Sequence, residues 1–110
     1  MTENIVILST CTNEEEAGRI AQALIADSLA ACVSVLPGAR SYYRWKGQVE
    51  DSAECLLVIK SSRRLFGAVR AAIEKAHSYE VPEIVAIRIE AGLPAYLQWV
   101  SESSQNTDTA

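Results

Sequence analysis

Strand-like and helix-like segments alternate along this chain in an order that few folds share. Residues 5–10 form a β-branched run that is short enough for a strand buried on both faces. Apolar residues then recur at helical spacing, which predicts a helix over about residues 13–28. Thr12 and Glu15 have the spacing of a capping box, so we expect Thr12 to begin this helix.

The next two strand patterns predict a long hairpin. Residues 31–36 have strand character, a Pro-Gly pair at 37–38 interrupts it, and alternation resumes over residues 41–46. A turn is expected at Lys46 and Gly47, after which residues 54–59 can return antiparallel. We therefore expect one long, bent strand whose hairpin reaches beyond a small core.

The last third of the chain repeats the alternation of helix and strand. Ser61 or Ser62 is expected to cap a helix that ends near His77, and residues 84–89 are predicted to form the last core strand. Pro94 suits the first turn of a short third helix. The order β-α-β-β-α-β plus a C-terminal helix predicts an α+β fold, a ferredoxin-like sandwich with an extended hairpin. We expect one domain over residues 1–101 and interpret the polar residues 102–110 as a frayed tail.

Composition and charge narrow the range of partners. Ten Lys and Arg against fourteen Asp and Glu give a net charge of −4 without a basic cluster, so we expect neither nucleic acid nor a membrane as partner. No apolar stretch approaches the roughly 20 residues of a membrane helix, and the N-terminal residues lack signal-peptide features. Three cysteines fit no disulfide framework, which favours reduced thiols and a cytoplasmic location. Cys32 and Cys55 are expected in the core, and Cys11 nearer the surface.

The predicted fold hosts many activities, and several of them lack their residues here. An RNA-recognition domain needs stacking aromatics on the strand at residues 54–60, which has none. A copper-chaperone C-x-x-C motif would begin at Cys11, but Glu14 stands where the second thiol belongs. The acidic run 14–16 would repel a phosphate. It can be interpreted as a cation site, but its negative charge better suits a helix N-terminus. No nucleophile has an identifiable partner base, so we expect no enzyme.

Aromatic residues are concentrated in the predicted hairpin. Three of the seven aromatics in the chain, Tyr42, Tyr43 and Trp45, fall within four consecutive positions. Aromatic side chains are enriched at protein interfaces, which favours assembly of several copies through this segment. The alternative is that these rings cover the core of their own sheet.

Five sequence segments occur in a recognisable order: LAACV at 29–33, SYYRWKG at 41–47, ECLLVIK at 54–60, HSYEVPEI at 77–84 and YLQW at 96–99. This series, within about residues 4–101, resembles the signature blocks of the CutA family of divalent-cation tolerance proteins. The resemblance implies a compact, stable homotrimer of ferredoxin-like subunits whose extended hairpins join sheets across subunits. It also implies a link to tolerance of copper and other divalent metals, with no established reaction and no tightly bound cofactor.

The resemblance directs attention to His77, the only histidine. Some family members carry a thiol at the position of Ser9 and two adjacent histidines at those of Ala76 and His77, a set able to bind copper. Cys11 lies on the same side of a strand as position 9 and can replace that thiol. With Glu83 as a further ligand, the predicted metal residues are His77, Cys11 and Glu83, and the predicted ion is Cu²⁺ or another divalent cation. The alternative for the imidazole is that it caps the end of its helix or forms a hydrogen bond there, next to the last carbonyls.

A second candidate site is a cleft between subunits. In a trimer, Tyr43, Trp45, Glu54, Lys60 and Tyr79 could line such a cleft, because binding residues gather at strand ends. The alternative for Lys60 is a surface ion pair that contributes about 0–1 kcal/mol. Two functions therefore stay open: a non-enzymatic homotrimer that binds divalent cations, and a signalling or scaffold trimer whose clefts take a small anionic ligand or a partner's peptide.

Overall fold

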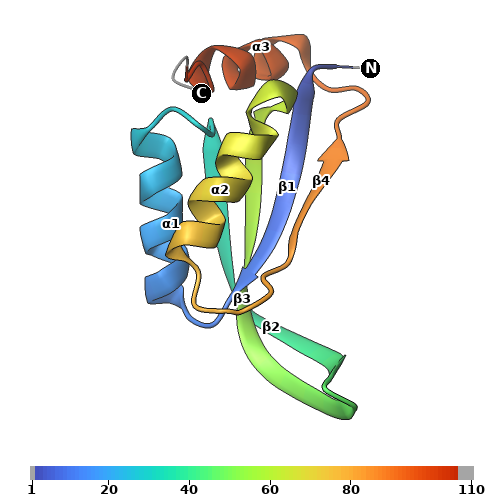
Figure 1. The fold of residues 1–110 in the computed structure, drawn as a ribbon. Helices are drawn as coiled ribbons and strands as arrows, with labels where there is room; N and C mark the ends of the chain where they lie inside the picture. Colours follow the sequence, from blue (N-terminus) through green and yellow to red (C-terminus); the bar gives the residue numbers. More distant parts are fainter. Residues whose placement is uncertain (1, 107–110) are drawn as a thin grey trace.

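A computed structural model describes residues 2–106 and shows a four-stranded sheet with two helices across one of its faces (Figure 1). The elements are β1 (Asn4–Cys11), α1 (Glu14–Ala26), β2 (Cys32–Trp45), β3 (Gln48–Ser62), a 3-10 turn (Arg63–Leu65), α2 (Phe66–Ala76), β4 (Ile84–Arg88) and α3 (Pro94–Ser103). Neighbouring strands are antiparallel, in the order β2-β3-β1-β4. This is the α+β, ferredoxin-like βαββαβ sandwich that the sequence predicts.

The core lies between the sheet and the pair α1 and α2. Alternate residues of β1 point toward the helices, so Ile5, Ile7 and Cys11 are buried on that face. The helices contribute the other side of the core, through buried residues that include Ile20, Leu24, Val69 and Ile73. Full burial of one such side chain contributes about 1.5–3 kcal/mol, so this core fixes which residues of β1 face the helices.

The start of α1 differs from the prediction by one residue. Asn13, not Thr12, is the N-cap, and its side-chain oxygen accepts a hydrogen bond of 2.9 Å from the backbone N–H of Glu16. Asparagine is among the strongest N-cap residues because its short side chain reaches this N–H. The acidic run 14–16 occupies the first turn, as predicted.

The C-terminal segment is more ordered than the predicted frayed tail. Ser104 is fully buried, and its hydroxyl lies 2.7 Å from that of Ser62. The backbone N–H of Asn106 donates to the carbonyl of Ser28 at 3.2 Å. Ser62 therefore holds the end of the chain and does not cap α2, and Ser61 donates to the Leu29 carbonyl instead. Residues 107–110, the rest of the predicted tail, lie outside the described residues.

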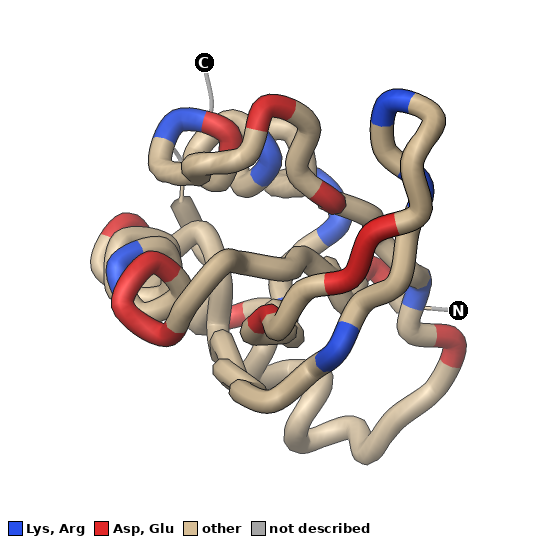
Figure 2. Tube along the Cα trace, turned by 90° about the horizontal axis from the view of Figure 1, so that it is seen from below, with Lys and Arg blue, Asp and Glu red and all other residues tan. Residues whose placement is uncertain are grey.

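The hairpin of β2 and β3 projects beyond the sheet, at the bottom of Figure 1, and the molecule is 44 Å long and 27 Å wide. The strand register shifts between Leu36 and Ala39, where Gly38 has a φ of +85°, and this irregularity bends the hairpin as predicted. The turn also confirms the prediction, since Lys46 and Gly47 both have positive φ. Seen from below, the hairpin carries both acidic and basic residues (Figure 2).

The aromatic residues of the hairpin do not cover the core of their own sheet. Tyr42 is 73% exposed, Tyr43 41% and Trp45 38%. Of the two interpretations that the sequence leaves open, the structure of the single chain therefore favours a contact surface.

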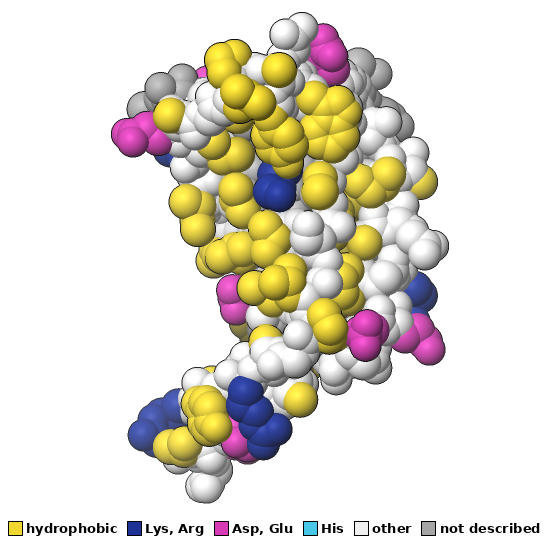
Figure 3. Space-filling view, turned by 180° about the vertical axis from the view of Figure 1, so that it is seen from behind, with side chains coloured by type: hydrophobic (Ala, Val, Ile, Leu, Met, Phe, Trp, Pro, Cys, Tyr) yellow, Lys and Arg dark blue, Asp and Glu magenta, His cyan; other side chains and the backbone are white. Residues whose placement is uncertain are grey.

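The sheet face opposite α1 and α2 is open and largely apolar (Figure 3). Leu36 of β2 and Val85 and Ile87 of β4 are about half exposed, and Trp99 of α3 is 44% exposed. An apolar face of this kind is usually covered by another protein surface.

Candidate functional site

Three side chains that can ligate a metal meet where β1 ends, α1 begins and α2 ends. Cys11 is the last residue of β1, Glu16 lies in the first turn of α1, and His77 follows α2 directly. Their donor atoms, one sulfur, one carboxylate oxygen and one ring nitrogen, all lie within 4.8 Å of one another. We call these three residues the thiol cluster.

The imidazole of His77 is held in one tautomer by the backbone. Its Nε2–H donates to the carbonyl of Thr10 at 2.6 Å, and its Nδ1 accepts the N–H of Tyr79 at 3.0 Å. Nδ1 therefore carries no proton, and the ring is neutral. The same Nδ1 lies 3.7 Å from Oε1 of Glu16, and the side chain of His77 is fully buried. A backbone carbonyl on the second ring nitrogen is also the arrangement that orients metal-binding histidines.

Glu16 comes from the acidic run that the sequence pattern assigns to a helix N-terminus rather than to a cation site. Its side chain is only 4% exposed, and its Oε2 accepts the N–H of Ser78 at 3.1 Å. Within residues 2–106, its Oε1 has no hydrogen-bond partner. Burying a carboxylate oxygen without a donor is costly, so a cation beside Oε1 would remove that cost.

The thiol of Cys11 is fully buried, so the expectation that it lies nearer the surface is wrong. β1 continues through residue 11 with its side chain turned toward the helices, on the same face as Ser9, as the sequence predicts. Burial and the negative charge of Glu16 raise the pKa of the Cys11 thiol to about 12. The thiol is therefore protonated at neutral pH, and a metal ion must displace that proton.

The two other cysteines differ in their burial. Cys55 is in the core, opposite Cys11 in the β1–β3 register, whereas Cys32 is only partly buried at the start of β2. The expectation of a core position is thus confirmed for Cys55 and not for Cys32.

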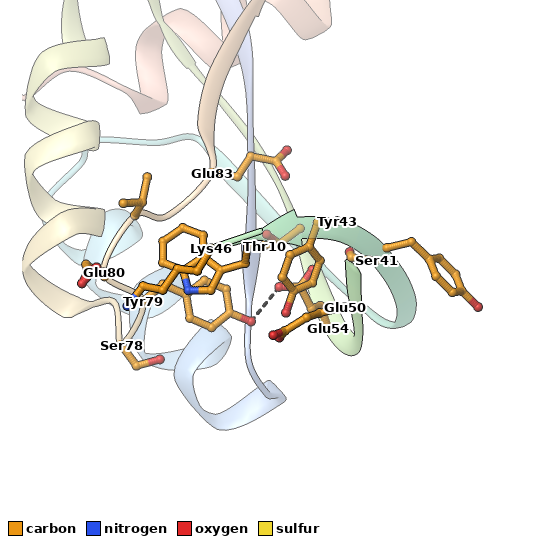
Figure 4. Close-up of a pocket in the computed structure, with 13 residues that line it drawn as sticks. Thr10, Ser41, Tyr43, Lys46, Glu50, Glu54, Ser78, Tyr79, Glu80 and Glu83 are labelled. Carbon is orange, nitrogen blue, oxygen red and sulfur yellow. Dashed lines mark hydrogen bonds between the residues drawn. The ribbon is translucent and has the colours of Figure 1, made fainter. Parts of the chain in front are cut away.

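The predicted metal residues are brought together only in part. His77 and Cys11 lie in the thiol cluster, where Glu16 stands as the third ligand. Glu83 is elsewhere, on the wall of a cavity of about 840 Å³ between the hairpin and residues 78–83 (Figure 4).

The same cavity contains most of the residues predicted for an inter-subunit cleft. Tyr43, Trp45, Glu54 and Tyr79 line it within a single chain. The hydroxyl of Tyr79 donates to Oε2 of Glu54 at 2.6 Å, the dashed line in Figure 4. Burial and this carboxylate raise the pKa of the Tyr79 phenol well above its ordinary value. Lys60 does not reach the cavity and lies within β3 instead, between β1 and β2.

The fold is ferredoxin-like, and the residues that can bind a metal or a small ligand lie at the end of the sheet from which the hairpin projects. The sequence profile of the CutA1 divalent ion tolerance protein family matches residues 5–103, and the chain belongs to this family.

Curated relatives and solved structures agree with this assignment. The Divalent-cation tolerance protein CutA of Thermus thermophilus is 42% identical over 90% of this chain and 96% of its own length. Protein CutA of Mus musculus is also 42% identical, but this chain spans only 59% of that relative. The crystal structure of CutA from Xylella fastidiosa superposes with a TM-score of 0.92 at 36% identity, covering 94% of this chain and all of that one.

Proposed function

We propose that this chain is a non-enzymatic, homotrimeric protein that binds divalent cations, and that Cys11, Glu16 and His77 are its metal ligands. The observation that carries the proposal is the thiol cluster, in which three donor atoms lie within 4.8 Å of one another. The relatives in Thermus thermophilus and Pectobacterium atrosepticum are named divalent-cation tolerance proteins, which supports the same class of function here.

The donor set fits copper and zinc better than magnesium or calcium. Thiolate sulfur and imidazole nitrogen favour the later transition metals, and the usual order of affinities puts Cu²⁺ first. To bind such an ion, Cys11 would lose its proton and Nδ1 of His77 would exchange the N–H of Tyr79 for the metal. Nε2–H of His77 would keep the Thr10 carbonyl, so the ring would not need to turn.

Cobalt spectroscopy tests the thiol ligand directly, because Co²⁺ bound to thiolate gives a charge-transfer band that oxygen and nitrogen ligands do not. We expect the band in the parent protein and in the matched thiol control Cys32→Ser, and its absence in Cys11→Ser. Calorimetry with Zn²⁺ should show loss of binding in His77→Ala and weaker binding in Glu16→Gln. A band that persists in Cys11→Ser, or equal Zn²⁺ affinity in His77→Ala, would overturn the assignment of these ligands.

The homotrimer is supported by the surface of the single chain. The open sheet face exposes Val85 and Ile87, and the hairpin projects past the core with Tyr42 73% exposed. Three copies can cover these surfaces at once if each hairpin reaches a neighbour. Sedimentation equilibrium should give three times the chain mass of 12.0 kDa, and a particle of 12.0 kDa at micromolar concentration would contradict the trimer.

We also propose a cytoplasmic location, on the basis of the three free cysteines. Within residues 2–106, no helix combines the length and the hydropathy needed to cross a membrane. Relatives are named for other compartments: a periplasmic protein in Archaeoglobus fulgidus and a chloroplastic one in rice. Fractionation of the source cells tests the proposal, and recovery of the protein outside the cytoplasm would contradict it.

The alternative function, a scaffold trimer with a ligand in a cleft, is supported by the cavity of about 840 Å³. Its lining does not favour the anionic ligand that the sequence suggested, because the described residues that line it include Glu50, Glu54, Glu80 and Glu83 and only one basic residue, Lys46.

A further inference from the structure

We propose that the cavity between the hairpin and residues 78–83 binds a small organic cation, an alkylammonium or guanidinium group. The cation would belong either to a free amine or to a Lys or Arg side chain of a peptide. This inference goes beyond metal binding and does not depend on the thiol cluster.

One face of the hairpin brings aromatic rings and carboxylates together. Tyr43 lies opposite Glu50 in the β2–β3 register, and Trp45 is two residues further along β2 on the same side. Glu54 lies at the base of the hairpin, next to the bend, and Tyr79 faces it from the other wall. An aromatic face attracts a cation and a carboxylate neutralises it, so both kinds of contact are available in one cavity.

The structure already contains a contact of the proposed kind. Nζ of Lys46 lies over the ring of Trp45, 5.9 Å from its centroid. Lys46 is also the only basic residue among the described residues that line the cavity. An ammonium group supplied by the chain itself thus lies at a ring that a ligand would use.

The charge of the residues that line the cavity determines which sign of ligand charge is favoured. Four acidic residues, Glu50, Glu54, Glu80 and Glu83, line the cavity together with one basic residue, Lys46, and acidic residues are visible along the hairpin in Figure 2. Coulomb repulsion therefore disfavours an anion. A bare metal ion would satisfy the carboxylates but not the rings, whereas an organic cation has an apolar part and a charge and can use both.

The site is more than a group of exposed acids, because Glu54 is fixed in place. It is only 8% exposed, and its Oε2 accepts the short hydrogen bond from Tyr79. A carboxylate that is already oriented loses little freedom when a ligand binds. The volume of about 840 Å³ is within the range of small-molecule sites, roughly 300–1,000 Å³.

The proposal is tested by titrating the metal-free protein, in buffer with a chelator, with three ligands of equal shape and different charge. These are n-butylammonium, neutral n-butanol and anionic butanoate, with binding followed by tryptophan fluorescence and by NMR. We expect binding of n-butylammonium, weaker binding of butanol and none of butanoate. Butanoate binding as well as n-butylammonium would overturn the proposal. Comparison of 1,4-diaminobutane with a lysine tripeptide blocked at both ends then identifies the source, since the tighter binder shows whether a free amine or a peptide is preferred.

Variants locate the binding to this cavity. Glu50→Gln and Trp45→Leu should each weaken n-butylammonium binding by roughly threefold to tenfold. Lys46→Met should strengthen it, because the competing ammonium group is removed. Glu74→Gln, the same charge change on the exposed side of α2, is the matched control and should have no effect. Equal affinity in Glu50→Gln and Glu74→Gln would refute the site, and because both residues are exposed, misfolding of either variant is not expected.

Discussion

Raising the pH should tighten Zn²⁺ binding to the thiol cluster by about tenfold per pH unit between about pH 7 and pH 9.5. The reason is the proton on Cys11, which must leave before the sulfur can bind the ion. The pKa of this thiol is raised to about 12, so it remains protonated in the metal-free protein throughout that range. Nδ1 of His77 already carries no proton, and its ligation releases none.

The expected magnitude separates a buried thiol from an ordinary one. One proton released per ion gives a slope of one in the logarithm of affinity against pH, and higher pH favours binding because it removes the competing proton. A thiol with an ordinary pKa of about 8.5 would give the same slope only below that pH and a plateau above it. For Cys11 we expect no plateau up to about pH 9.5.

The assay is competition between the protein and a chromophoric Zn²⁺ chelator, calibrated at each pH. Cys11→Ser should lose the slope, and Cys32→Ser should keep it because that thiol lies outside the cluster. A flat profile for the parent protein, or the same slope in Cys11→Ser, would refute this reasoning.

Three further predictions concern stability and assembly. The pKa of the Cys11 thiol is higher in the folded protein than in the unfolded chain, so its contribution to stability is complete below about pH 8.5 and falls by about 1.4 kcal/mol per pH unit above it. In urea unfolding, Cys11→Ala should therefore lose less stability than the parent between about pH 8.5 and 10.5, and parallel losses would contradict this. Tyr79→Phe should cost about 1–3 kcal/mol in urea unfolding, since buried Glu54 loses its donor, and an unchanged free energy of unfolding would show that this hydrogen bond adds nothing. Ile87→Lys on the open sheet face should give 12.0 kDa particles by sedimentation, whereas Ile25→Lys on α1, of similar exposure, should not; a trimer in both would place the interface elsewhere.

Most of the fold could be predicted because its signals are local. The spacing of apolar residues distinguishes β1 and β4 from α1 and α2, and each element needs only its own segment to be recognised. The bend of the hairpin follows from a glycine at residue 38, and its turn from Lys46 and Gly47. The start of α1 was misassigned because Thr12 and Asn13 are both good N-cap residues, and the choice between them depends on where β1 ends.

The candidate sites were less predictable because they join residues that are distant in the chain. Glu16 belongs to an acidic run that the helix dipole explains equally well, and only the placement of His77 beside it shows that one of these carboxylates is buried. Lys60 was predicted as a site residue from its position near a strand end, but the strand register assigns it to the middle of the sheet. Glu83 was predicted as a metal ligand, but it lines the cavity and is not part of the thiol cluster. The order of the C-terminal segment depends on the buried pair Ser62 and Ser104, which has no apolar pattern to reveal it.

Native mass spectrometry of untagged, metal-free protein with one equivalent of Zn²⁺ per chain tests the central claim most directly, because it counts chains and ions together. The account predicts a particle of three 12.0 kDa chains that carries up to three ions in the parent and in Cys32→Ser, and no ion in Cys11→Ser or His77→Ala. Ions retained by both of the latter variants, or a parent trimer that takes up none, would contradict it.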